Sequence, residues 1–202
     1  EMEALEDFDA SGLPNITFRD EMSLFVDDIV VRLIHLPSGH TNGDLAIWIP
    51  KLDILFTGDT FMTGGYPLID LRSGTIRGLI KAVNAMIQIA GDNTLIIPGH
   101  GNLLQKANGS VEGPTREDLI QYLHMLITVT TEVEKLKQQG LSLLEINNRQ
   151  PTQEFDQEWD NNLICSENFV SFVYNILPGR KDNISPCSDI DQIDFSPPLK
   201  TL

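Results

Sequence analysis

Residues 36–44 read Leu-Pro-Ser-Gly-His-Thr-Asn-Gly-Asp, and the interpretation of the whole chain starts from this stretch. An apolar run ends at Leu36, so His40 lies in a glycine-containing turn directly after a predicted strand. A strand end holds such a turn rigidly and can aim a side chain outward, as ligand and catalytic groups require. Taken alone, His40 is more often a turn residue that hydrogen-bonds to nearby backbone.

Two further predicted strand ends carry side chains of the same kind. Residues 56–60, Phe-Thr-Gly-Asp-Thr, place Asp59 after a glycine, and residues 96–101, Ile-Ile-Pro-Gly-His-Gly, place His100 between two glycines. Imidazole nitrogens and carboxylate oxygens are zinc ligands, and neighbouring strand ends bring such groups together at one sheet edge. We therefore predict that the three side chains converge, each pair within the roughly 10 Å that a two-zinc cluster bridges.

Through these motifs the chain resembles the C-terminal half of a metallo-β-lactamase-fold zinc hydrolase, over most of residues 13–175. The resemblance implies that His40 is a ligand of the first of two zinc ions and His100 a ligand of the second. Asp59 would bridge both ions and is therefore the candidate catalytic residue as well. The implied activity is hydrolysis of an ester, thioester, lactone or lactam by a metal-bound hydroxide.

The first half of that family's site is missing from this sequence. The H-x-H-x-D-H signature, which precedes the His40 motif in the family, is absent, and the other two histidines have no ligand at the required spacing. We interpret His35 as packed on a sheet face and His124 as a helix residue beside an apolar stripe. Because catalytic zinc sites usually have three protein ligands per ion, this chain alone is expected to bind metal weakly and to be inactive.

Apolar periodicity predicts the elements around the motifs. Strands are predicted at residues 16–18, 23–26, 29–36, 45–49, 52–56 and 95–97, and helices at 73–90, 115–140, 142–149 and after Ser166. Thr115 and Asp118 have capping-box spacing at the start of the longest helix. The predicted fold class is α+β, half of an αβ/βα sandwich with one mixed or mostly antiparallel sheet flanked by helices. Residues 1–178 would form this domain portion, and residues 179–202 an extended or flexible tail.

Composition restricts the classes of partner. The 14 basic and 29 acidic side chains give a net charge of −15, which disfavours binding to nucleic acid and to anionic membranes. With 41% hydrophobic residues and no long apolar run, we expect a soluble protein, either cytoplasmic or secreted after signal cleavage. Cys165 and Cys187 are interpreted as two free thiols or one incidental bridge.

Two functions from different classes stay open. The first is part of a longer zinc hydrolase whose N-terminal half is cleaved, deleted or omitted, which a start at Glu1 rather than Met favours. The second is a non-catalytic interaction module that retains only the half-fold. A half-sandwich leaves one sheet face uncovered, so we expect the missing half or a second copy of the chain as partner, giving an oligomer in the latter case.

The segment after Asp59 holds one candidate substrate contact in the complete protein. Tyr66 follows two glycines and precedes a proline, and it would either contact a small-molecule substrate or simply pack within its loop. The acidic run at residues 156–160 is interpreted as a solvated face.

Overall fold

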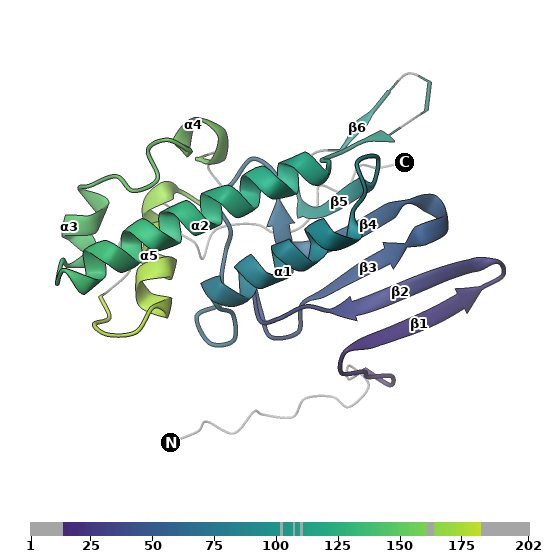
Figure 1. Cartoon of the computed structure of the whole chain (residues 1–202), viewed down its shortest axis with the longest axis horizontal. Coiled ribbons are helices and arrows are strands. Elements are labelled where there is room, and N and C mark those ends of the chain that lie inside the picture. The colour runs from purple at the N-terminus through teal and green to yellow at the C-terminus, as the bar shows by residue number, and fades with distance from the viewer. Residues whose placement is uncertain (1–13, 102, 107, 110, 161–163, 183–202) are drawn as a thin grey trace, which may run out of the picture.

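The computed structural model contains a five-stranded sheet and describes residues 14–101, 103–106, 108–109, 111–160 and 164–182. The strand order is β1-β2-β3-β4-β5, antiparallel except for the parallel pair β4 and β5 (Figure 1). The strands are β1 (Glu21–Val26), β2 (Ile29–His35), β3 (Leu45–Ile49), β4 (Ile54–Met62) and β5 (Leu95–His100). The predicted α+β class, with one mixed sheet flanked by helices, is confirmed.

The strands predicted at residues 23–36 and 45–56 form two hairpins, and each hairpin turns through an aspartate in the left-handed region. Asp27 (φ 53°) lies between β1 and β2, and Asp53 (φ 53°) follows the short 3-10 turn η2 (Pro50–Leu52) between β3 and β4. Aspartate tolerates this conformation better than most residues. The prediction of a strand at residues 16–18 is wrong. β2 ends at His35, and its antiparallel pairing with β1 stops at Glu21, so residues 16–18 have no strand to pair with there.

The helix α1 (Ile76–Ile89) connects β4 to the parallel strand β5 and covers one face of the sheet. Its N-cap is Thr75, whose side chain accepts a hydrogen bond from the Gly78 N–H, so the helix begins later than the periodicity alone predicts. Its buried residues and those of the sheet belong to one core that includes Leu79, Val83, Met86, Ala46, Leu55 and Ile96. A helix can lie between β4 and β5 because two parallel strands need a long connection.

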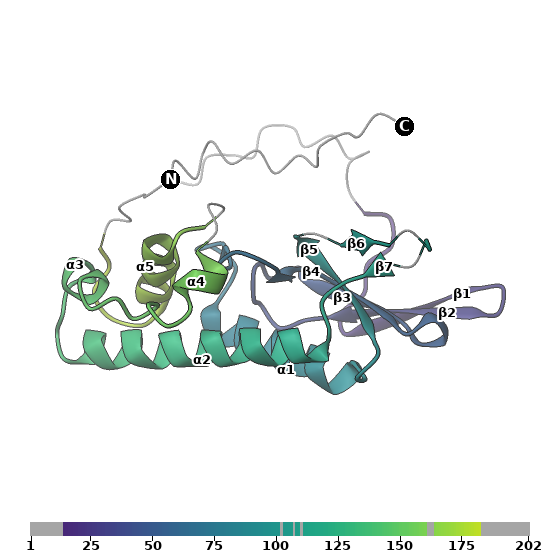
Figure 2. The same cartoon turned by 90° about the horizontal axis from the view of Figure 1, so that it is seen from above.

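The longest helix, α2 (Arg116–Gln138), begins at the predicted capping box of Thr115 and Asp118. Figure 2 shows one half of α2 beside α1 under the sheet and the other half beside the C-terminal helices. These helices are α3 (Leu143–Asn147), α4 (Asp156–Trp159) and α5 (Ser166–Ile176). A small hairpin of β6 (Leu104–Gln105) and β7 (Val111–Glu112) precedes α2.

The other face of the sheet carries an apolar row. The strand register sets Leu33 opposite Ile47, Ile47 opposite Phe56, and Phe56 opposite Ile97, and we call these four residues the open-face row. No helix within the described part of the chain lies over this face (Figure 2), and Phe56 is 36% exposed. The described residues therefore cover only one of the two faces of the sheet.

The structure also bears on the interpretation of His35 and of the two cysteines. His35 does not pack on a sheet face: it is exposed at the end of β2, and its Nε2 donates to the Asn42 carbonyl oxygen at 3.1 Å. Cys165 is disulfide-bonded, whereas Cys187 lies outside the described residues, as do residues 183–202 of the predicted tail. Among the described helices, none has the length and apolarity to cross a membrane.

Candidate metal centre

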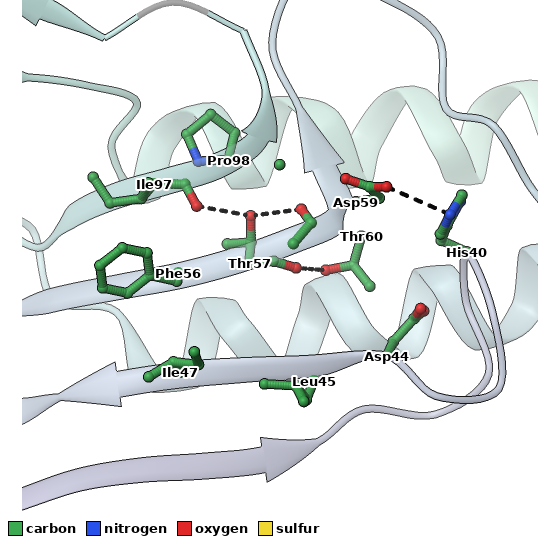
Figure 3. A pocket seen from close by; sticks show the side chains of 12 residues that line it. His40, Asp44, Leu45, Ile47, Phe56, Thr57, Asp59, Thr60, Ile97 and Pro98 are labelled. Carbon is green, nitrogen blue, oxygen red and sulfur yellow. Dashed lines mark hydrogen bonds and ion pairs between the residues drawn. The ribbon is translucent and has the colours of Figure 1, made fainter. Parts of the chain in front are cut away.

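The structure brings together the three residues predicted from the strand ends. His40 Nε2 lies 3.5 Å from Asp59 Oδ2, and His100 Nε2 lies 3.4 Å from Asp59 Oδ1. The carboxylate therefore stands between two imidazoles, with one oxygen directed to each; Figure 3 shows the His40 side of this arrangement. All three side chains retain solvent access, with exposed fractions of 19% for His40, 37% for Asp59 and 30% for His100.

Asp59 and His100 occupy strands rather than the turns expected from the sequence. β4 continues to Met62 and β5 to His100, with register shifts in their pairing between Phe56 and Met62. Such irregularities re-aim side chains, and Gly58 adopts a φ of 53° there. Gly99 leaves the space that the carboxylate occupies, because a Cβ at this position would lie 2.1 Å from Asp59 Oδ1.

The ring of His40 is oriented by a backbone carbonyl. His40 Nδ1 lies 2.8 Å from the Leu68 carbonyl oxygen, which only accepts hydrogen bonds. Nδ1 therefore carries a proton, and in the neutral ring the lone pair is on Nε2, which faces Asp59. A metal-ligating histidine is usually held in this way, by a hydrogen bond from the ring nitrogen that does not bind the metal.

The two nitrogen–oxygen distances at Asp59 match part of a zinc coordination sphere. Two ligands on one tetrahedral zinc ion, with bonds of about 2.0–2.1 Å, lie about 3.3 Å apart, close to both nitrogen–oxygen separations here. Each oxygen of Asp59 thus fits one ion shared with one histidine. However, no three His, Cys, Asp or Glu side chains in the described ranges are arranged to hold a single metal ion. Either ion would need further ligands from elsewhere.

The site opens into a cavity of about 480 Å³ on the open face of the sheet. One end is lined by His40, Asp44 and Asp59, and the other by Ile47, Phe56 and Ile97 of the open-face row (Figure 3). Among the described residues that line this cavity, none is lysine or arginine. The candidate metal donors and the uncovered apolar face are therefore two ends of one depression.

Tyr66 lies in the core rather than at this cavity. Its side chain is fully buried, its ring stacks on Phe169 with centroids 5.0 Å apart, and its hydroxyl donates to Asp156 Oδ1 at 2.9 Å. Burial is the main cause that raises the pKa of Tyr66, and Asp156 raises it further. Of the two interpretations offered for Tyr66, loop packing is the one that this geometry favours.

The acidic run at residues 156–160 is not simply a solvated face, which corrects the sequence interpretation. Asp156 accepts the Tyr66 hydrogen bond, and Trp159 is buried, with its ring 5.3 Å from that of Tyr122. His124, by contrast, lies at the surface of α2 with an edge contact to Phe155. It takes no part in the candidate site.

Comparisons with known proteins indicate the family of this chain. The sequence model of the metallo-beta-lactamase superfamily matches residues 2–100, the part of the chain that contains all three converging residues. The chain belongs to this superfamily of metallo-hydrolases. The solved structure of a double mutant of the sec-alkyl sulfatase PisA1 has a similar fold, with a TM-score of 0.61 and 18% identity. That similarity covers 80% of this chain and 26% of the sulfatase chain.

Curated relatives match this chain over only part of their own length. An uncharacterized protein of Mycobacterium leprae is 33% identical over 85 residues, which is 42% of this chain and 38% of the relative. The probable metallo-hydrolase YqgX of Bacillus subtilis is 27% identical over 63 residues, 31% of this chain and 30% of the relative. The chain thus matches less than half the length of either relative.

Proposed function

We propose that this chain is the C-terminal portion of a zinc-dependent hydrolase, in which His40, Asp59 and His100 supply part of a two-zinc site. The observation that carries the proposal is the placement of the two Asp59 oxygens, each 3.4–3.5 Å from the Nε2 of a different histidine. Membership of the metallo-hydrolase superfamily supports it, as does the name of the Bacillus relative.

The three residues have separate roles in this proposal. Asp59 would hold the bound metal together with both histidines, His40 on one side of its carboxylate and His100 on the other. When bound, the metal supplies a Lewis acid and activates water for attack on a carbonyl group. The Leu68 carbonyl keeps the His40 ring in one tautomer, and Gly99 leaves room for the Asp59 carboxylate. The proposed substrates are esters, thioesters, lactones or lactams.

The proposed partner is the N-terminal half of the same fold. The cavity runs from Asp59 to Phe56 and Ile97 without interruption, so a polypeptide that covers the open-face row also lies beside the candidate metal donors. Such a polypeptide is in a position to complete both coordination spheres and to bury the apolar row. A second copy of the chain is the alternative occupant of this face.

A non-catalytic interaction module is the second candidate function. It is favoured by the incomplete donor set, because the described residues offer no three side chains that hold one ion. In this case the open-face row would bind its partner without any metal.

The test uses the complete polypeptide that contains these residues, with bound zinc and hydrolysis of a panel of esters, thioesters, lactones and lactams as readouts. We expect two zinc ions per polypeptide and turnover of one class of substrate. Asp59→Asn should release metal and abolish most turnover, because the bridging charge is lost. The matched control Asp53→Asn alters a carboxylate that binds only Thr94 among its described contacts, and should change neither readout. A metal-free, inactive wild type would support the interaction module instead.

A further inference from the structure

The turn that carries His40 is organised by one carboxylate. Asp44, which is 9% exposed, accepts hydrogen bonds from the Gly39 N–H at 3.2 Å and from the Thr41 N–H at 2.9 Å. It also accepts the Thr41 hydroxyl proton at 2.7 Å. The donors are the residues immediately before and after His40. The backbone on both sides of the histidine is therefore tied to a single side chain.

The segment between β4 and α1 holds the same turn from the other side. The Asp70 N–H donates to the His40 carbonyl oxygen at 2.9 Å, and the Thr75 N–H donates to the Gly39 carbonyl oxygen at 3.0 Å. The contact is close, because a Cβ at Gly74 would lie 2.3 Å from the His40 carbonyl oxygen. These backbone contacts depend on the turn keeping the conformation that Asp44 imposes.

Asp44 also lies in the cavity wall beside His40 (Figure 3), but it is not arranged as a metal ligand. Oδ1 accepts two hydrogen bonds from Thr41, and Oδ2 accepts one from Gly39. With both oxygens engaged by donors of the turn, the carboxylate serves the conformation of its own loop. Its effect on the site is therefore exerted through His40.

We infer that Asp44 is a positioning residue that fixes the turn at residues 39–41, so that His40 keeps Nδ1 on the Leu68 carbonyl and Nε2 toward Asp59. The importance of this orientation for metal binding rests on the proposed function, whereas the orientation itself does not. The inference is therefore tested on the ring of His40 in the metal-free chain.

Long-range ¹⁵N–¹H NMR of histidine side chains reports the tautomer of each ring, and this chain has only four histidines. At about pH 8, where an ordinary histidine is neutral, wild-type His40 should show the Nδ1–H tautomer. In Asp44→Ala the turn no longer holds the His40 ring against the Leu68 carbonyl oxygen, so the His40 signal should broaden or average between the two tautomers. Asp44→Asn retains one acceptor oxygen and should show a smaller change.

Matched variants separate positioning from a general loss of structure. Asp53→Asn changes a carboxylate at the opposite end of β4 and should leave the His40 signal as in the wild type. The signal of His124, which lies on α2 away from this turn, reports whether each variant is folded. If Asp44→Ala does not fold, Thr41→Val removes the hydroxyl bond to Asp44 and should broaden the His40 signal in part. An unchanged Nδ1–H signal in a folded Asp44→Ala, or in Thr41→Val when that variant replaces it, would overturn the inference. Neither readout involves metal or turnover, so a failure here leaves the proposed hydrolase function standing.

Discussion

Adding one methyl group at Gly99 should displace the carboxylate at the centre of the candidate site. An ideal Cβ at this position would lie 2.1 Å from Asp59 Oδ1, 2.6 Å from the Gly58 carbonyl carbon and 2.8 Å from the Asp59 amide nitrogen. The φ angle of Gly99 is not in the left-handed region, so the conflict is one of space and not of backbone conformation. Gly99→Ala therefore isolates the close approach of β4 and β5.

The size of the effect follows from these distances. Ordinary contact begins at 3.4 Å, so the new methyl group is short by about 1.3 Å toward the carboxylate and about 0.8 Å toward the Gly58 carbon. The carboxylate can rotate away, but the strand backbone has to shift. Overpacking of this kind costs about 1–3 kcal/mol, and the backbone contacts place Gly99→Ala at about 2–3 kcal/mol. For a domain of this size that corresponds to a fall in Tm of about 4–12 °C.

Thermal and urea unfolding followed by circular dichroism measure this change, with Gly91→Ala as the matched control. A Cβ at Gly91 would meet only the Thr94 hydroxyl oxygen at 3.7 Å, an ordinary contact, so the control should shift the unfolding free energy by less than about 1 kcal/mol. NMR signals of His40 and His100 should move in Gly99→Ala and not in Gly91→Ala. If both variants unfold at the wild-type temperature, the close approach of Gly99 to Asp59 is not a feature of the protein.

Three further outcomes are expected. Tyr66→Phe removes the buried hydrogen bond to Asp156 and should lower the free energy of unfolding in urea by about 1 kcal/mol; no change would remove Tyr66 from the core network. The Ser142 hydroxyl, and then its N–H, hold the pKa of Glu145 below its ordinary value of 4.5. This contribution to stability is complete above that value and is lost as the pH falls through the lower folded pKa. Glu145→Gln should therefore flatten the acid limb of stability against pH, and an unaltered limb would contradict the cause assigned. Phe56→Asp should leave the chain folded by circular dichroism but prevent its co-purification with a separately expressed N-terminal half, and retained association would exclude the open-face row as the docking surface.

Local pattern was enough to predict most elements and the convergence of the three residues. The strands of both hairpins and the four predicted helices follow from apolar spacing and caps, such as the Thr115 capping box, because these signals lie within a few residues. The grouping of His40, Asp59 and His100 followed from placing each beside the end of a strand in one sheet. Their role as zinc ligands stays a prediction.

Contacts between distant segments were not available from pattern. β4 continues through Asp59 because its irregular pairing with β5 depends on a strand some forty residues away. The acceptor for His40 is the Leu68 carbonyl, a backbone group that any residue type would supply. The Asp156 partner of Tyr66 is 90 residues away in sequence, so its acidic neighbourhood looked solvated. The inferred role of Asp44 has a local signal, because a carboxylate three residues after a threonine can accept hydrogen bonds from that residue.

His40, Asp59 and His100 are proposed to act together as metal ligands. Titration of the chain with an excess of Zn²⁺, followed by the same histidine side-chain NMR, tests it with two internal controls. We expect the Nε2 signals of His40 and His100 to shift together and those of His35 and His124 to stay unchanged. Asp59→Asn should suppress the shifts, whereas Asp53→Asn should preserve them. Equal shifts at all four histidines, or shifts that persist in Asp59→Asn, would contradict a shared metal site of His40, Asp59 and His100.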